Sequence, residues 1–164
     1  MSGAGSPTFE IDASGLRVAI VHASWHREIM AGLRAGALRA GTAAGVTMEE
    51  FEVPGSFELP IVVDACAASG RFDAIVALGV VIKGGTPHFE YVCQAATSGL
   101  TRAALDHGIP VGFGLLTCDD EQQARDRAGL DGSREDKGAE ALLSAVTTTI
   151  TLRRVRDSSP GGNT

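Results

Sequence analysis

The sequence predicts an α/β fold, a three-layer α/β/α sandwich around a four-stranded parallel sheet. Four short apolar runs alternate along the chain with longer segments in which apolar residues follow the helical period. The third run, residues 74–82, is apolar throughout, as expected for a strand that is buried on both faces. Regular alternation of strand and helix favours parallel strands joined by right-handed crossovers, with helices on both faces of the sheet.

The predicted elements follow from these runs and from the residues that end them. Gly45 suits the end of the first helix, because glycine readily adopts the left-handed conformation there. The second strand is more polar than the first, which places it nearer a sheet edge. Ser56 is a suitable N-cap for the second helix, and Pro60 is tolerated in its first turn. Residues 119–121 place acidic groups at the start of the fourth helix, and residues 133–136 have the spacing of a capping box that opens the last one. In chain order, the strands are predicted over residues 16–23, 46–53, 74–82 and 111–117, and the helices over 26–44, 57–68, 86–106, about 121–128 and 133–156.

Composition and charge restrict the class of protein. The chain has 164 residues, of which 44% are hydrophobic and 21% are charged, as is typical of one soluble domain. Its net charge of −6 argues against nucleic acid or an anionic membrane as the main partner. Cys66, Cys93 and Cys118 lie far apart without metal-ligand spacing, so we expect reduced thiols and no metal site. Since no signal peptide or membrane span is apparent either, these features predict a cytoplasmic protein.

A single domain is expected over residues 15–156, flanked by two short terminal segments. Residues 1–14 are rich in Gly, Ser, Ala and Pro and form an N-terminal arm. Within this arm, residues 8–12 alternate apolar and polar side chains, which predicts a short strand that needs another sheet to pair with. Residues 157–164 are expected to form a flexible C-terminal tail.

The turn after the third strand has the features of an anion-binding site. Ligands of parallel sheets bind beyond the carboxyl ends of the strands. Here the strand ends at residues 83–85 (KGG), Thr86 can act as an N-cap, and Pro87 suits the first helical position. Free N–H groups and the positive end of the helix dipole then face the turn. His88 lies in the first helical turn, where it can transfer protons near neutral pH. The same residues also fit a flexible turn with an exposed histidine, and the two interpretations are about equally favoured.

Other strand ends carry residues that also allow two interpretations. Trp25, the only tryptophan, follows the first strand and is either a core residue or a platform for a planar ring. Glu58 either complements the helix dipole or accepts hydrogen bonds from a polyol or an amine. His22 lies within the first strand and is expected to be packed, whereas His26 and His107 are expected at the surface or at helix ends.

Four segments together resemble the lumazine synthase family, whose members catalyse the penultimate step of riboflavin biosynthesis. They are residues 53–60 (VPGSFELP), 77–93 (ALGVVIKGGTPHFEYVC), 127–129 (RAG) and 136–138 (DKG). Each segment is a weak signal alone, but their occurrence in the family's order and at family-like spacing is highly specific. The likeness spans roughly residues 9–156 and implies a flavodoxin-like sheet.

The resemblance implies a transferase that needs neither cofactor nor metal. It would condense 5-amino-6-(D-ribitylamino)uracil with 3,4-dihydroxy-2-butanone 4-phosphate to give 6,7-dimethyl-8-ribityllumazine, phosphate and water. The substrate amine attacks the ketone, so the protein mainly aligns the reactants and moves protons.

Matching motif positions also implies roles for individual residues. His88 would be the proton-transfer residue, and Trp25 and Phe113 would cover the pyrimidine ring from opposite sides. The ribitylaminouracil would be bound by Trp25, Ser56, Glu58, Val80, Val81, Ile82, Phe113 and Lys137. The phosphate of the second substrate would be bound by Gly85, Thr86 and Arg127.

The resemblance further implies a homo-oligomer with active sites between subunits. Family members are pentamers, either free or arranged as decamers or sixty-subunit shells, and the N-terminal arm adds a strand to a neighbour's sheet. Phe113, Arg127 and Lys137 would then come from the subunit opposite His88. The loop over residues 130–136 is longer than the compact turn of shell-forming members, which favours a free pentamer. Riboflavin synthase is a possible pathway partner.

Three other interpretations are compatible with the same fold. A flavodoxin-like module could hold FMN or a lumazine without catalysis, using the glycine turn and Trp25. A structural shell protein with a vestigial site is a second possibility, although His88, Arg127 and Lys137 together argue against a decayed site. The third is a specialised paralogue with a different main substrate.

Overall fold

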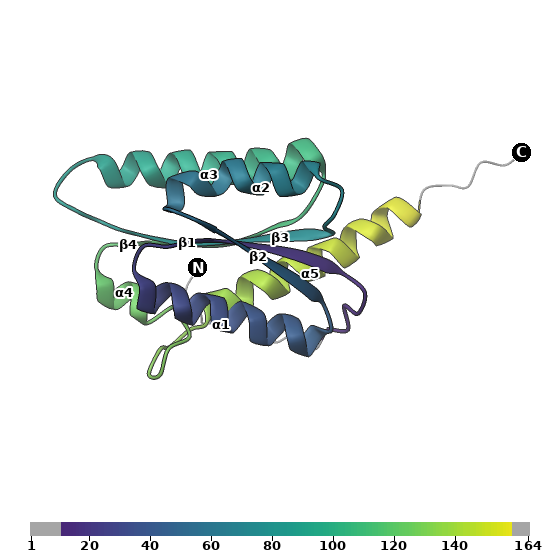
Figure 1. The fold of residues 1–164 in the computed structure, drawn as a ribbon, viewed down its shortest axis with the longest axis horizontal. Coiled ribbons are helices and arrows are strands. Elements are labelled where there is room, and N and C mark those ends of the chain that lie inside the picture. The colour runs from purple at the N-terminus through teal and green to yellow at the C-terminus, as the bar shows by residue number, and fades with distance from the viewer. Residues whose placement is uncertain (1–10, 159–164) are drawn as a thin grey trace, which may run out of the picture.

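The computed structural model describes residues 11–158, which form a four-stranded parallel sheet with helices on both faces (Figure 1). The strand order is β2-β1-β3-β4, and all three strand pairs are parallel. The predicted three-layer, flavodoxin-like α/β fold is therefore confirmed. The strands are β1 (Arg17–Ala23), β2 (Thr47–Val53), β3 (Ala74–Ile82) and β4 (Val111–Cys118), and the helices are α1 (Arg27–Ala44), the 3₁₀ turn η1 (Ser56–Glu58), α2 (Leu59–Ala68), α3 (His88–His107), α4 (Glu121–Arg125) and α5 (Lys137–Asp157).

The core consists of two apolar layers, one on each face of the sheet. Helices α1 and α5 cover one face, and α2 and α3 cover the other (Figure 1). Along β1, Val18 and Ile20 pack under α1, while Ala19 and Val21 pack in the opposite layer. β1 and β3 are buried on both faces because they lie in the centre of the sheet, whereas β2 is largely exposed, as its polar sequence predicts.

The strand register brings the carboxyl ends of all four strands to one edge of the sheet. Ala23 of β1 lies beside Val53 of β2, and Ile82 of β3 lies beside Cys118 of β4. The chain segments that leave these strands therefore emerge together. This edge is the one that the sequence predicts to bind ligands.

The predicted N-caps Ser56, Thr86 and Ser133 are all wrong. Helix α3 begins at His88 with Pro87 in the N-cap position, so Thr86 is not the cap and no side chain caps this helix. Ser56 does not cap the second helix either, because its hydroxyl donates instead to the carbonyl oxygen of Val80 at 3.4 Å. At that turn the Glu58 carboxylate accepts from the Gly55 N–H at 3.0 Å.

The helices after β4 also differ from the prediction. Helix α4 is shorter than predicted and ends at Arg125, after starting at an Asp120 cap that accepts from the Gln123 N–H. Helix α5 starts at Lys137, and its N-cap is Asp136 rather than Ser133. Ser133 Oγ instead accepts from the Leu130 N–H within the preceding loop.

The terminal segments are only partly described. Residues 1–10 and 159–164, with most of the predicted arm strand and tail, lie outside the described residues. Ile11 packs against the core without belonging to a strand, and α5 continues to Asp157, one residue into the predicted tail. Within residues 11–158, no helix is long and apolar enough to cross a membrane.

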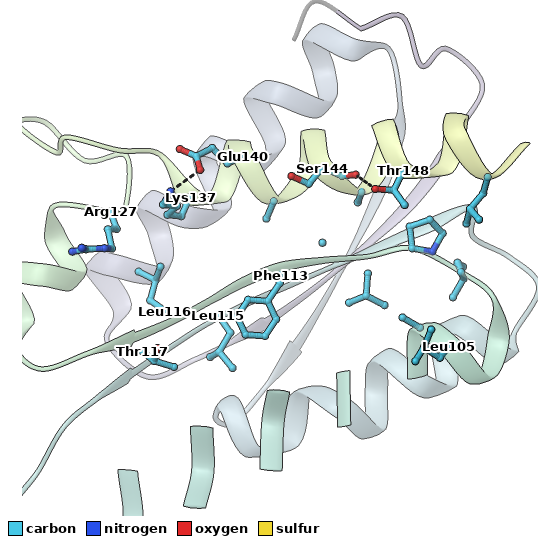
Figure 2. A pocket seen from close by; sticks show the side chains of 18 of the residues that line it. Leu105, Phe113, Leu115, Leu116, Thr117, Arg127, Lys137, Glu140, Ser144 and Thr148 are labelled. Atoms are coloured by element: carbon cyan, nitrogen blue, oxygen red, sulfur yellow. Dashed lines mark hydrogen bonds and ion pairs between the residues drawn. The ribbon is translucent and has the colours of Figure 1, made fainter. Parts of the chain in front are cut away.

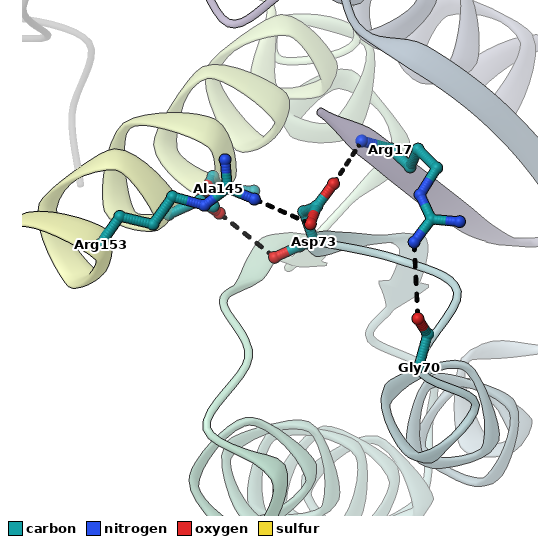
Figure 3. Close-up of polar contacts among 6 residues, drawn as sticks. Arg17, Gly70, Asp73, Ala145 and Arg153 are labelled. Carbon is teal, nitrogen blue, oxygen red and sulfur yellow. Dashed lines mark hydrogen bonds and ion pairs between the residues drawn. The ribbon is translucent and has the colours of Figure 1, made fainter. Parts of the chain in front are cut away.

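Asp73 ties the C-terminal half of α5 to the sheet at the edge opposite the predicted site (Figure 3). Its carboxylate accepts from the Arg17 backbone N–H at 2.7 Å and from the Arg153 guanidinium at 2.9 Å. Thr149 adds a longer contact to the Asp73 carbonyl oxygen at 3.4 Å. These contacts fix the end of α5 against the starts of β1 and β3.

Candidate active site

The predicted site residues fall into two separate groups. Most of them lie near the carboxyl edge of the sheet, whereas Phe113 lies in the first half of β4, beside Ala77 of β3. The first group follows β1, β2 and β3 and contains Trp25, Ser56, Glu58, Val80, Val81, Ile82, Gly85, Thr86 and His88. The second group lies on or after β4 and contains Phe113, Arg127 and Lys137.

In the first group, the turn after β2 is held against the end of β3. Ser56 is buried, and its hydroxyl donates to the Val80 carbonyl oxygen. Glu58 is fixed by its bond to the Gly55 N–H. A Cβ atom on Gly55 would lie 4.0 Å from two atoms of the Trp25 indole, so Trp25 lies over this turn. Trp25 itself is 69% exposed, so it is not a core residue and presents its ring to the surface.

Trp25 is oriented by an unusual backbone conformation in the next residue. His26 has φ 58° and is the only residue other than glycine with positive φ within residues 11–158. This left-handed turn occupies the N-cap position of α1 and reverses the chain directly after Trp25. As predicted, His26 is at a helix end, His107 ends α3, and His22 is packed, with 4% of its surface exposed.

The turn from Lys83 to His88 is open to solvent. All of its residues are exposed, and Cβ atoms on Gly84 or Gly85 would meet nothing within 4 Å. The turn is anchored at its start, where the Lys83 N–H donates to the Cys118 carbonyl oxygen at 2.9 Å. Because no side chain caps α3, its first N–H groups remain available to a ligand. The arrangement has the chemistry of the anion site that the sequence predicts.

The second group lines a groove along the free edge of β4, with a volume of about 940 Å³ (Figure 2). Its walls come from β4, α5 and the C-terminal end of α3. Arg127, Lys137 and Glu140 lie at one end, Leu105 lies at the other, and Phe113 lies between them (Figure 2). Phe113 is 50% exposed and Leu105 is 77% exposed, so the groove presents apolar as well as charged groups.

Arg127 and Lys137, the two cations at the Glu140 end of the groove, are held by neighbouring oxygen atoms. The Arg127 guanidinium donates to the Gln123 carbonyl oxygen at 2.8 Å. The Lys137 ammonium lies 2.7 Å from a Glu140 carboxylate oxygen and 3.0 Å from one of Glu135. Burial lowers the pKa of the Lys137 ammonium, but the two carboxylates outweigh this effect and raise it above its usual value. Lys137 is therefore a fixed positive charge at neutral pH.

The two groups do not form one cavity within a single chain. Among the described residues that line the β4 groove, none belongs to the first group. Glu140 and Gln123 also line the groove and were missed by the sequence analysis. The signal for Glu140 was its position three residues after Lys137, on the same side of a predicted helix. Within residues 11–158, no group of His, Cys, Asp and Glu side chains could hold a metal ion.

Comparison with known proteins gives a consistent result over almost the whole chain. Residues 15–153 match the family model described as 6,7-dimethyl-8-ribityllumazine synthase. The protein of that name from Kineococcus radiotolerans is 62% identical over 156 residues, which cover 94% of this chain and 96% of the relative. The one from Clavibacter michiganensis subsp. michiganensis is 62% identical over 159 residues, covering 95% and 99%. The one from Streptomyces avermitilis is 56% identical over 159 residues, covering 96% and 98%. The chain belongs to the 6,7-dimethyl-8-ribityllumazine synthase family.

Proposed function

We propose that the protein condenses 5-amino-6-(D-ribitylamino)uracil with 3,4-dihydroxy-2-butanone 4-phosphate, forming 6,7-dimethyl-8-ribityllumazine in riboflavin biosynthesis. The observation that carries this proposal is identity of 56–62% to relatives of that name over nearly the full chain. The open turn at the carboxyl edge of the sheet supports it, because one substrate carries a phosphate.

The first group of residues binds the ring and ribityl chain of one substrate and the phosphate of the other. Trp25 stacks on the pyrimidine, for which its exposed position over Gly55 is suitable. Ser56 and Glu58 bind the ribityl chain and the amine side. Residues 80–82 line the ring pocket and offer backbone hydrogen bonds at the end of β3.

The turn after β3 and the first turn of α3 act on the phosphorylated substrate. Gly85 and Thr86 bind its phosphate in the open turn, where the space beside Gly85 is empty, since a Cβ atom there would meet nothing within 4 Å. His88 is the first residue of α3 and transfers protons beside that phosphate. Because the substrate amine is itself the nucleophile, alignment of the two reactants supplies most of the rate, up to roughly 7–11 kcal/mol in favourable cases.

The second group completes the site of a neighbouring subunit. Phe113 covers the ring opposite Trp25, Arg127 binds the phosphate, and Lys137 approaches the ribityl chain. Two features of the single chain support this division: the groups line different surfaces, and the apolar edge of β4 is open. An uncovered apolar edge strand favours association with another chain. We favour a free homopentamer, in the cytoplasm, with riboflavin synthase as a possible pathway partner.

The test is a two-substrate assay followed by mixing of variants with impaired activity. Purified protein should convert both substrates to the fluorescent lumazine and release one phosphate per product. Binding of the lumazine without turnover would instead identify a non-catalytic binding module. Light scattering measures the mass of the assembly and hence its number of subunits.

Subunit mixing tests whether the site is shared between chains. His88→Ala and Arg127→Ala impair different halves of each site, so mixed oligomers contain some interfaces with both residues intact and with activity above that of either variant alone. Partial recovery of activity is expected after the two variants are denatured together and refolded. Mixing that is verified by mass spectrometry but restores no activity would contradict the shared site.

A further inference from the structure

The Asp136 carboxylate joins the start of α5 to α1, directly beside Lys137. One oxygen accepts from the Ala139 N–H at 3.0 Å and caps α5. The other accepts from the Arg39 guanidinium of α1 at 2.7 Å. The side chain of Asp136 is 26% exposed, whereas that of Arg39 is 63% exposed. This carboxylate thus adds an ion pair to α1 at the point where Gly138, the next residue but one in α5, packs against the Leu33 backbone of α1.

Two glycines leave the space that this carboxylate occupies. A Cβ atom on Gly36 of α1 would lie 2.1 Å from an Asp136 carboxylate oxygen, and one on Gly129 would lie 2.6 Å from the carboxylate carbon. Real Cβ atoms do not approach other atoms so closely. The Asp136 carboxylate is therefore enclosed between α1 and the turn at Gly129.

The backbone around Asp136 also joins Arg127 to Lys137. The Lys137 N–H donates to the Arg127 carbonyl oxygen at 2.9 Å, and the Gly129 N–H donates to the Glu135 carbonyl oxygen at 3.0 Å. Between these bonds, Ala128 and Asp136 form an antiparallel bridge. Residues 127–129 and 135–137 thus form a short two-stranded clamp. Ala128 packs it against Gly32 of α1, and Asp136 joins it to α1 by a hydrogen-bonded ion pair.

We propose that Asp136 is a positioning residue, which acts through this clamp to hold Arg127 and Lys137 in register for the neighbouring site. The inference rests on the proposed function, in which these two cations bind the phosphate and the ribityl chain. Without the carboxylate, the clamp loses its ion pair with α1 and α5 loses its cap, so both cations shift. A shift of about 1 Å at a binding group can cost up to roughly 100-fold in rate.

Asp73 provides a matched control at the other edge of the sheet. Its carboxylate also accepts one backbone N–H and one arginine, at 2.7 and 2.9 Å, and its side chain is 22% exposed. Asp73→Ala therefore removes the same kinds of bond as Asp136→Ala, but far from Arg127 and Lys137. A purely structural role predicts similar effects of both substitutions on stability and on kinetics.

The experiment measures kcat, the KM for each substrate and the melting temperature for the two alanine variants. We expect Asp136→Ala to raise the KM for the butanone phosphate about tenfold or more, and to weaken competitive inhibition by inorganic phosphate in parallel. Asp73→Ala should lower the melting temperature by a similar amount and leave this KM within about twofold. Unchanged KM and phosphate inhibition in a folded Asp136→Ala protein would overturn the proposal.

Two milder variants keep the test decisive if Asp136→Ala does not fold. Asp136→Asn keeps an oxygen that can cap α5 but loses the ion pair, and Arg39→Met loses the ion pair alone. Each substitution should raise the KM for the butanone phosphate by about two- to threefold. The double variant should have the same KM as either single variant, because both substitutions remove the same ion pair. Independent, additive effects, or no effect of either, would refute the positioning role.

Arg127→Ala separates failure of this inference from failure of the proposed function. If Arg127→Ala leaves the KM for the butanone phosphate unchanged, the assignment of the phosphate site is wrong. If Arg127→Ala raises that KM but the Asp136 and Arg39 variants do not, the site assignment holds and the positioning role of Asp136 is refuted.

Discussion

Replacing Gly138 by alanine should destabilise the contact between α1 and α5. Gly138 is the second residue of α5 and is buried. A Cβ atom there would lie 1.9 Å from the Leu33 carbonyl oxygen and 2.9 Å from the Leu33 Cα. Because both are backbone atoms of α1, no side chain can rotate away to make room. The two helices must separate by more than about 1 Å to accept the methyl group.

The expected cost combines two opposing effects. Overpacking against a rigid neighbour costs about 1–3 kcal/mol, whereas alanine gains up to roughly 1 kcal/mol over glycine in helix propensity. The net loss is about 1–2 kcal/mol, which for a chain of this size corresponds to a fall in melting temperature of roughly 3–6 °C. Since Lys137 precedes Gly138, the KM for the ribitylaminouracil should rise as well.

Thermal unfolding monitored by circular dichroism provides the assay. Protein concentration must be equal for all samples, because association of subunits contributes to the apparent stability. Gly84→Ala is the control, since a Cβ atom there meets nothing within 4 Å, and its melting temperature should stay within about 1 °C of the unmodified protein. A Gly138→Ala protein as stable as Gly84→Ala would refute the packing argument.

Three further predictions follow from single sites. His88→Ala should lower kcat by about 10²- to 10⁴-fold in a folded protein, and complete loss of turnover would contradict an alignment-based mechanism. The hydrogen bond from Arg34 holds the pKa of the Glu50 carboxyl below its usual 4.5. The ionised carboxylate therefore stabilises the fold above pH 4.5, and this stabilisation is lost as the pH falls through the lowered pKa. Arg34→Met should therefore show a weaker decline in urea-measured stability between about pH 5 and 3, and equal slopes would refute the coupling. Burial raises the pKa of the Cys66 and Cys118 thiols, so Ellman's reagent should modify them at pH 8 much more slowly in native than in denatured protein, and equal rates would contradict their burial.

The strands, and the position of β2 at an edge of the sheet, illustrate what local sequence predicts well. Continuous apolar runs predicted β3 with its observed bounds and β1 to within one residue. This is because a strand that is buried on both faces must be apolar at nearly every position. The polar character of β2 placed it at an edge, where it lies. The ends of parallel strands meet at one edge in any such sheet, so the region of the candidate site could also be predicted.

The helix caps show where local sequence is insufficient. Ser56, Thr86 and Ser133 all have side chains suited to capping, yet none of them caps the helix that follows it. The Ser56 hydroxyl bonds to β3 instead, and Asp136 caps α5 while also binding Arg39 of α1. A cap forms only where the backbone turns at the right residue, and contacts distant in sequence decide that position.

The sequence by itself determined the α/β class. It also predicted the carboxyl edge as the place of the candidate site and supplied residue types suited to a ring, a phosphate and proton transfer. These predictions were possible because the period of the apolar residues, the turn residues and the spacing of motifs are local properties of the chain. Only the tertiary structure revealed the β4 groove and the Glu140 contact of Lys137. It also showed that the two groups of site residues, which the family resemblance assigns to different subunits, line different surfaces of one chain. These depend on how α5 packs across α1 and the sheet, and that packing is set by contacts such as Gly138 against Leu33, which are over one hundred residues apart in the sequence.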